Sequence, residues 1–266
     1  MTKLIAVDMD GTLLNEKKEL PDGFIPWVKS HPNITVAIAS GRQYFTLLSM
    51  FSKIEKHLLF IAENGGVVFL RGEILYKNTL SKNQVLQIIG QLRKNPEYYI
   101  VLCGLHSSYT ENDDPEFLAK VDLYYARNTR VGSFEEILDR DEIIKMALYV
   151  KDLQAEAAYG RMPELPAYVA PVLSGVSWID LAGSSVNKGE ALRRVQEALE
   201  ITREETMAFG DYMNDADLLA ASGDSFAMQN SHPDLLPYAR YLAPSNEKGG
   251  VMKVLEHVID GKPIRP

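Results

Sequence analysis

The residues with the clearest chemical potential are two aspartates in the segment Asp8-Met9-Asp10-Gly11-Thr12. The apolar run before them is too short for a helix and is typical of a buried parallel strand that ends at Asp8. Two carboxylates at a strand tip repel each other unless a cation lies between them, and a hard divalent ion is the natural partner. Alternatively, one carboxylate attacks an electrophile while the other transfers protons. Gly11 would allow a sharp turn, and a loop of turn-forming aspartates is the alternative interpretation.

A second segment, Ser40-Gly41-Arg42, also follows an apolar run. We expect Ser40 to end a strand and Gly41 to open the following helix. The hydroxyl and the helix N-terminal amides would then form an anion site, to which the Arg42 guanidinium would add donors suited to phosphate. The alternative is that Ser40 is an ordinary helix cap.

A lysine is predicted in the first turn of a later helix, in Asn187-Lys188-Gly189. A positive charge at this position is unfavourable in the field of the helix macrodipole, so a negatively charged partner is expected. A bound phosphate would be such a partner. A solvated surface lysine is the alternative, because lysines are mostly exposed.

A further acidic strand end is predicted between Gly210 and Asp215. Asp211 would be a third carboxylate near the cation. Asn214 could hydrogen-bond a substrate, and Asp215 could hold either Lys188 or a metal-bound water. The alternative for Asn214 is that it caps the helix that follows.

Short apolar strands alternate with helices at both ends of the chain, which predicts an α/β fold with a doubly wound, Rossmann-like parallel sheet. Ligands of such sheets bind beyond the carboxyl ends of the strands, where Asp8, Ser40 and Glu63 would lie. A hairpin is predicted around Arg71-Gly72. The expected strands are 4–7, 34–39, 58–62, 206–209 and 224–228, and the expected helices are 21–30, 43–54, 188–199, 214–221 and 250–259.

The middle of the chain has a different pattern, in which strands and helices cluster as in an α+β domain. We therefore predict a core formed by 1–80 and 183–266, with 81–182 inserted as a second domain. A capping box, Ser81 with Gln84, is expected to open its first helix. The other elements expected there are strands 98–103, 143–150, 168–173 and 177–181 and helices 115–125 and 154–162.

The composition is that of an ordinary globular protein: 266 residues, 46% hydrophobic and 24% charged, with a net charge of −8. This negative charge argues against nucleic acid as the main partner. The single cysteine, Cys103, excludes an intramolecular disulfide and, with no His-Glu-x-x-His spacing, argues against zinc. The sequence contains no apolar run of about 18 residues, so no membrane span is expected. It also has no recognisable signal peptide, and a cytoplasmic location is expected.

The four segments together resemble the haloacid dehalogenase superfamily, and within it the Cof-like phosphatases that carry a large α/β cap. The motifs occur in the family's order: Asp8-x-Asp10-Gly11-Thr12, Ser40, Lys188 and Gly210-Asp211-x-x-Asn214-Asp215. Further similarity lies in Leu13-Leu14-Asn15, Glu63-Asn64-Gly65 and the stretch from Glu247 to Val251. The resemblance spans the whole core, and the insertion 81–182 falls where the family carries its cap.

The resemblance implies a role for each of these residues. Asp8 would attack phosphorus, and Asp10 would protonate the leaving oxygen and then deprotonate the water that cleaves the aspartyl-phosphate. Mg²⁺ would be held by the Asp8 carboxylate, the Asp10 backbone carbonyl and Asp211, with Asp215 behind them. The phosphate would be bound by Ser40, Gly41, Arg42, Lys188 and Asn214.

The expected function is thus hydrolysis of a small-molecule phosphate monoester, such as a sugar phosphate or similar metabolite. A Mg²⁺-dependent phosphomutase with the same paired aspartates is the first alternative. A catalytically weak sensor of a phosphorylated ligand is the second. The sequence identifies neither the substrate nor the oligomeric state.

Overall fold

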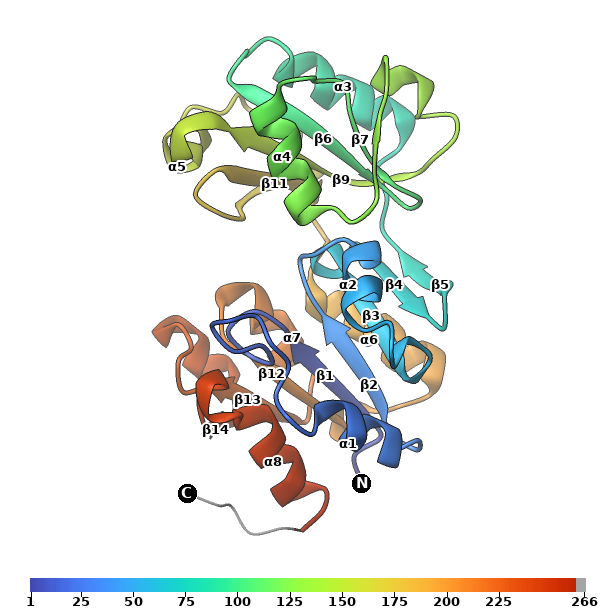
Figure 1. The fold of residues 1–266 in the computed structure, drawn as a ribbon, viewed down its shortest axis with the longest axis vertical. Helices are drawn as coiled ribbons and strands as arrows, with labels where there is room; N and C mark the ends of the chain where they lie inside the picture. Colours follow the sequence, from blue (N-terminus) through green and yellow to red (C-terminus); the bar gives the residue numbers. More distant parts are fainter. Residues whose placement is uncertain (262–266) are drawn as a thin grey trace. The chain divides into compact units, whose positions relative to one another are not determined.

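A computed structural model describes residues 1–261 of the chain. It divides into two compact units, each with its own sheet and core (Figure 1). The first comprises Met1–Tyr44, Met50–Tyr76 and the described residues from Asn187 onward, and the second comprises Phe45–Ser49 and Lys77–Val186. The predicted insertion, 81–182, is shorter than the second unit, and the last five residues of the predicted core lie outside the described part.

The core sheet has eight strands in the order β14-β13-β12-β1-β2-β3-β4-β5. The pairs from β14 to β3 are all parallel, whereas β4 runs antiparallel to β3. The strands are β1 (Leu4–Asp8), β2 (Thr35–Ala39), β3 (Leu58–Ala62), β4 (Val67–Leu70), β5 (Glu73–Lys77), β12 (Thr206–Gly210), β13 (Asp224–Met228) and β14 (Tyr241–Ala243).

Strand β1 lies between β12 and β2, and all five of its residues are buried. A strand buried on both faces must be apolar throughout, which explains the continuous Leu4–Val7 run. Asp8 pairs with Ala39 in register, so the residue after β2, Ser40, begins beside the tip of β1. The carboxyl ends of the central parallel strands therefore meet at one edge of the sheet.

Helices cover both faces of this sheet. On one face, apolar residues of α6 (Lys188–Leu199) and α7 (Ala216–Ala220) share a core with alternate residues of the central strands. On the other face, Phe24 of α1 (Phe24–Ser30) contacts Phe51, which in turn contacts Phe60 of β3. The first unit also contains α8 (Gly250–Val258), whereas most of α2 (Tyr44–Met50) belongs to the second unit. The predicted doubly wound α/β core is confirmed.

The second unit is built on a six-stranded sheet in the order β10-β11-β9-β6-β7-β8, antiparallel except for β7 with β8. Helices α3 (Lys82–Leu92) and α5 (Ala155–Tyr159) pack in one hydrophobic cluster and α4 (Pro115–Tyr124) packs in another. The strands are β6 (Tyr98–Gly104), β7 (Ser108–Thr110), β8 (Asn128–Arg130), β9 (Ile143–Val150), β10 (Val169–Leu173) and β11 (Trp178–Gly183).

Several predicted elements differ in length or kind. The helix expected over 43–54 is the seven-residue α2, and the helix expected over 214–221 begins only at Ala216. The three-residue strands β7, β8 and β14 were not predicted, because so short a segment carries no readable alternation of apolar and polar residues. The capping box at Ser81 is present. Among residues 1–261, no helix has the length and apolar character needed to cross a membrane.

Candidate active site

Asp8 is the last residue of β1 and is buried. Its Oδ1 accepts a hydrogen bond from Lys188 Nζ at 2.6 Å. Burial raises the pKa of the Asp8 carboxyl well above its usual range, and the nearby Asp215 adds to the rise, while Lys188 opposes it. The negative charge around Asp8 is therefore not fully compensated by the one ammonium group that contacts it, Lys188.

Lys188 is completely buried at the first position of α6, so the surface alternative is excluded. Its Nζ also donates to Asp215 Oδ1 at 2.7 Å. Burial lowers the pKa of this ammonium, but Asp215 and Asp8 outweigh that effect and the pKa is raised. Two carboxylates therefore compensate the lysine at the helix N-terminus, where the sequence suggested a bound phosphate.

The residues after β12 are held by hydrogen bonds to two carboxylates. Asp215 Oδ2 accepts from the backbone N–H groups of Asp211, at 3.0 Å, and Tyr212, at 3.2 Å. The Asp211 carboxylate accepts from Thr12 Oγ1 at 3.0 Å. A Cβ at Gly210 would lie 2.5 Å from the Asp215 side chain, so only glycine permits this close approach.

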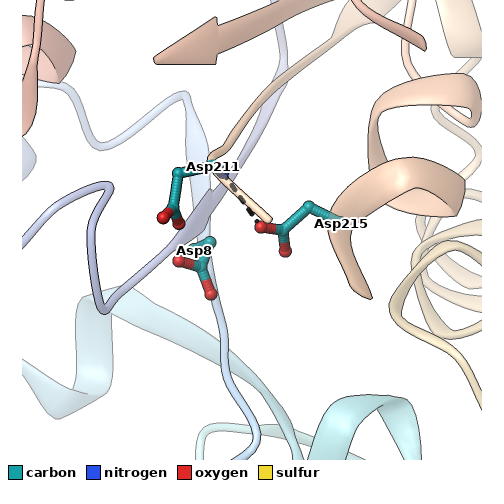
Figure 2. A group of neighbouring side chains, drawn as sticks. All are labelled: Asp8, Asp211 and Asp215. Carbon is teal, nitrogen blue, oxygen red and sulfur yellow. Dashed lines mark hydrogen bonds between the residues drawn. The ribbon is translucent and has the colours of Figure 1, made fainter. Parts of the chain in front are cut away.

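Three carboxylates form a group that could hold a metal ion (Figure 2). One oxygen each from Asp8, Asp211 and Asp215 lies within 4.8 Å of the others. Burial, and then Asp215, raises the pKa of the Asp211 carboxyl as well. Three neighbouring carboxylate oxygens fit a hard divalent cation such as Mg²⁺, which would relieve their repulsion.

Gly11 is needed beside this group. Its φ is +86°, and a Cβ there would lie 2.2 Å from Asp211 Oδ2. The sharp turn expected at Gly11 is present, and it lets the backbone after β1 pass directly over the Asp211 carboxylate.

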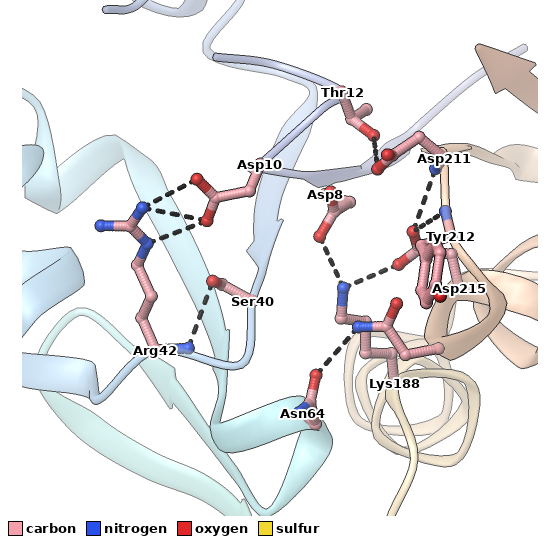
Figure 3. Close-up of polar contacts among 11 residues, drawn as sticks. Asp8, Asp10, Thr12, Ser40, Arg42, Asn64, Lys188, Asp211, Tyr212 and Asp215 are labelled. Carbon is pink, nitrogen blue, oxygen red and sulfur yellow. Dashed lines mark hydrogen bonds and ion pairs between the residues drawn. The ribbon is translucent and has the colours of Figure 1, made fainter. Parts of the chain in front are cut away.

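The Asp10 carboxylate is not a member of the group and lies against Arg42 (Figure 3). Arg42 Nη2 donates to Oδ1 at 2.8 Å and to Oδ2 at 3.0 Å, and Lys18 Nζ donates to Oδ1 at 2.8 Å. Burial alone would raise the pKa of Asp10, but the hydrogen bonds and charges of Arg42 and Lys18 lower it. From the sequence we expected the Arg42 guanidinium to bind phosphate, whereas in the structure it binds the Asp10 carboxylate.

Ser40 and Gly41 lie in a loop, because α2 begins only at Tyr44. The expectation that Gly41 opens the helix is wrong, so an anion bound at Ser40 and Gly41 would meet loop amides and not the amides of a helix N-terminus. Ser40 Oγ accepts a hydrogen bond from the backbone N–H of Arg42 at 3.2 Å. Ser40 thus shapes the loop that carries Arg42, and it does not cap α2.

Asn214 lies in a short 3-10 turn, Met213–Asp215, and is exposed. The capping interpretation is wrong, since the residue before α7 is Asp215. Instead, Asn214 Nδ2 donates to Asn64 Oδ1 at 3.2 Å. We named Asn64 from the sequence only as part of the Glu63-Asn64-Gly65 similarity and assigned it no role. Asn64 follows β3, has a φ of +55°, and donates its N–H to Ser40 O. Its place after the third parallel strand was the signal that could have identified it.

Comparison with known proteins identifies the family to which a chain with this fold and this acidic group belongs. The family model described as haloacid dehalogenase-like hydrolase matches residues 5–255, and the chain belongs to this family. The predicted superfamily is therefore confirmed.

The alignments with known relatives cover nearly the whole chain. A 5-amino-6-(5-phospho-D-ribitylamino)uracil phosphatase of Escherichia coli is 33% identical, covering 97% of this chain and 96% of its own. A Bacillus subtilis phosphatase, YwpJ, is 28% identical, with 97% and 100% covered. The solved structure of a haloacid dehalogenase-like hydrolase from B. subtilis superposes with a TM-score of 0.81 at 25% identity, with 97% and 100% covered.

Proposed function

We propose that the protein is a Mg²⁺-dependent phosphatase that hydrolyses a small-molecule phosphate monoester through an aspartyl-phosphate on Asp8. That it is a phosphatase of the haloacid dehalogenase type rests on its family and on the names of its relatives. The observation that carries the mechanism is the buried Asp8, held by Lys188 within the group of three carboxylates.

Asp8, Asp211 and the Asp10 backbone carbonyl would hold Mg²⁺, with Asp215 as the third carboxylate of the group. When bound, the ion would neutralise charge on the phosphoryl oxygens and so permit an anionic nucleophile to approach. Thr12 orients the Asp211 carboxylate for this task through its 3.0 Å hydrogen bond.

Asp8 supplies the attacking oxygen. A bond forms between an Asp8 carboxylate oxygen and phosphorus, while the bond from phosphorus to the ester oxygen breaks. Lys188, itself fixed by Asp215, holds the Asp8 side chain and brings a positive charge close to the transferred group. Because this ammonium is buried and ionised, its charge acts without competition from water.

Asp10 acts as the general acid and then as the general base. Its acid form, which Arg42 and Lys18 make the minor form by lowering the pKa, donates a proton to the leaving oxygen. Its carboxylate then takes a proton from the water that attacks the aspartyl-phosphate. We assign Ser40, Gly41, Arg42, Lys188 and Asn214 to the phosphoryl oxygens and their surroundings. In this assignment Arg42 has two tasks, because its donors already bind Asp10.

The inserted domain is assigned the choice of substrate, since the four motifs account for the chemistry in the core alone. The relatives are named for different phosphorylated compounds, including 5-amino-6-(5-phospho-D-ribitylamino)uracil and HMP-PP. We therefore propose the class, a small phosphorylated metabolite, and place the phosphoribitylamino compound first among those to be tested.

The test is release of inorganic phosphate from a panel of phosphate esters in the presence of Mg²⁺. A phosphatase releases phosphate from at least one ester, whereas a phosphomutase returns an isomerised phosphate ester. No release from any ester would favour the sensor alternative. With Asp8→Asn, release should stop, and an unchanged rate would remove Asp8 from the nucleophile's role.

A further inference from the structure

Lys18 is a second cation on the Asp10 carboxylate, and neither the sequence motifs nor the family resemblance selected it. Its Nζ lies 2.8 Å from Asp10 Oδ1, the oxygen that also accepts from Arg42 Nη2 at 2.8 Å. Arg42 Nε binds the other oxygen, Oδ2, at 3.1 Å. Two side chains from loops after different strands thus hold one carboxylate.

The turn that carries Lys18 is held closed by hydrogen bonds between Asn15 and Glu19. The backbone N–H of Asn15 donates to Glu19 O at 3.1 Å, and the N–H of Glu19 donates to Asn15 Oδ1 at 2.9 Å. Asn15 Nδ2 donates to Glu19 Oε2 at 3.1 Å. These bonds support a φ of +63° at Lys18, a conformation that is unfavourable for a residue with a Cβ.

The same turn is attached to the C-terminal segment of the core. The backbone N–H of Glu16 donates to Glu247 Oε1 at 2.6 Å, and Asn246 Nδ2 donates to Leu14 O at 2.9 Å. Contacts on both sides of the turn restrict its movement. Lys18 is consequently presented to Asp10 from a fixed backbone, although more than half of its side chain is exposed.

We propose that Lys18 is a positioning residue that, together with Arg42, fixes the orientation of the Asp10 carboxyl group for proton transfer. Arg42 binds both oxygens from one direction, and Lys18 adds a second direction on Oδ1, so that rotation of the group is opposed. This inference rests on the proposed role of Asp10, in which its proton passes to the leaving oxygen as the ester bond breaks.

The test compares Lys18→Met on two aryl esters that differ in their need for that proton. Phenolate is a poor leaving group, whereas p-nitrophenolate leaves readily without protonation. We expect kcat/KM for phenyl phosphate to fall about fivefold more than kcat/KM for p-nitrophenyl phosphate, because this constant includes the step in which the ester bond breaks. Lys18→Arg should restore most of the loss.

Two control variants distinguish the effect of losing the Lys18 charge from the effect of disturbing the turn that carries it. Lys17→Met removes the same charge from an exposed neighbour in the same turn and should leave both constants unchanged. Lys18→Gly suits the positive φ and keeps the turn, so it should show the same selective loss as Lys18→Met. If Lys18→Gly retains full activity on phenyl phosphate, the side chain is dispensable and the inference is wrong.

Asp10→Asn distinguishes failure of this inference from failure of the proposed mechanism. If Asp10→Asn loses phenyl phosphate activity selectively while Lys18→Met affects both esters equally, Lys18 has no positioning role and the role of Asp10 stands. If Asp10→Asn shows no selectivity, Asp10 is not the proton donor and both proposals fail.

Discussion

Lys188 Nζ lies 2.6 Å from Asp8 Oδ1, and the lysine side chain is fully shielded from solvent. The same nitrogen lies 2.7 Å from Asp215 Oδ1. A buried ammonium between two carboxylates leaves the site with an excess of negative charge, since Asp211 lies in the same group. Such an excess of negative charge favours the binding of a cation by this group.

Replacing Lys188 should damage stability as well as activity. In Lys188→Met, Asp8 and Asp215 remain buried without their ammonium, and breaking such a buried pair costs about 3–5 kcal/mol. Urea denaturation of the metal-free protein measures this loss. Lys29→Met, at an exposed lysine in α1, is the control and should change the unfolding free energy by less than about 0.5 kcal/mol. Equal stabilities for the two variants would contradict the charge balance described for the site.

Replacing Gly11 should weaken cation binding. In Gly11→Ala, the new Cβ would meet Asp211 Oδ2 at 2.2 Å, so the carboxylate must move. Gly72→Ala is a matched control, because Gly72 has nearly the same φ, +85° against +86°, with no atom within 4 Å of the added Cβ. Both variants should lose about 1 kcal/mol of stability from backbone strain. Only Gly11→Ala should require more Mg²⁺ for half-maximal phosphatase activity.

Asp211→Asn tests the metal group directly. The amide is a weaker ligand than a carboxylate for a hard cation, so the Mg²⁺ concentration for half-maximal activity should rise at least about tenfold. The hydrogen bond from Thr12 Oγ1 can still be accepted by the amide oxygen, which preserves the local structure. A Mg²⁺ titration identical to that of the unsubstituted protein would exclude Asp211 from the metal group.

The stability of the metal-free protein should fall as the pH rises above the usual pKa of aspartate. Burial raises the pKa of Asp8 above 3.8 in the folded state, so the folded protein binds more protons than the unfolded chain between the two pKa values. Stability is then lost with increasing pH across that window. Asp8→Asn should remove this part of the slope, which denaturation at a series of pH values measures.

Mg²⁺ should oppose the same loss. A ligand present at about 100 times its Kd stabilises the folded state by about 2.7 kcal/mol. Thermal unfolding at neutral pH with Mg²⁺ and with a chelator should therefore differ by several degrees. The difference should be smaller in Asp211→Asn. An unfolding temperature indifferent to Mg²⁺ would speak against a cation site in the folded protein.

The amino-acid sequence by itself determined the class of fold and the positions of the acids. Short apolar runs such as Leu4–Val7 are typical of buried parallel strands, and the residue that follows such a parallel strand lies at the carboxyl edge of the sheet. Asp8, Ser40 and Asp211 were found on this basis, since each depends only on its own neighbours in the chain.

The tertiary structure decided which of these side chains bind one another. Lys188 and Asp8 are 180 residues apart, Asn214 and Asn64 are 150 residues apart, and Arg42 could equally have served phosphate or Asp10. The pattern of residue types in one short segment contains no information on such pairs, because the pairs form only when separate segments meet at the edge of the sheet. Burial then selects the partners, because each charge removed from water must find an opposite charge or a cation among the groups that surround it.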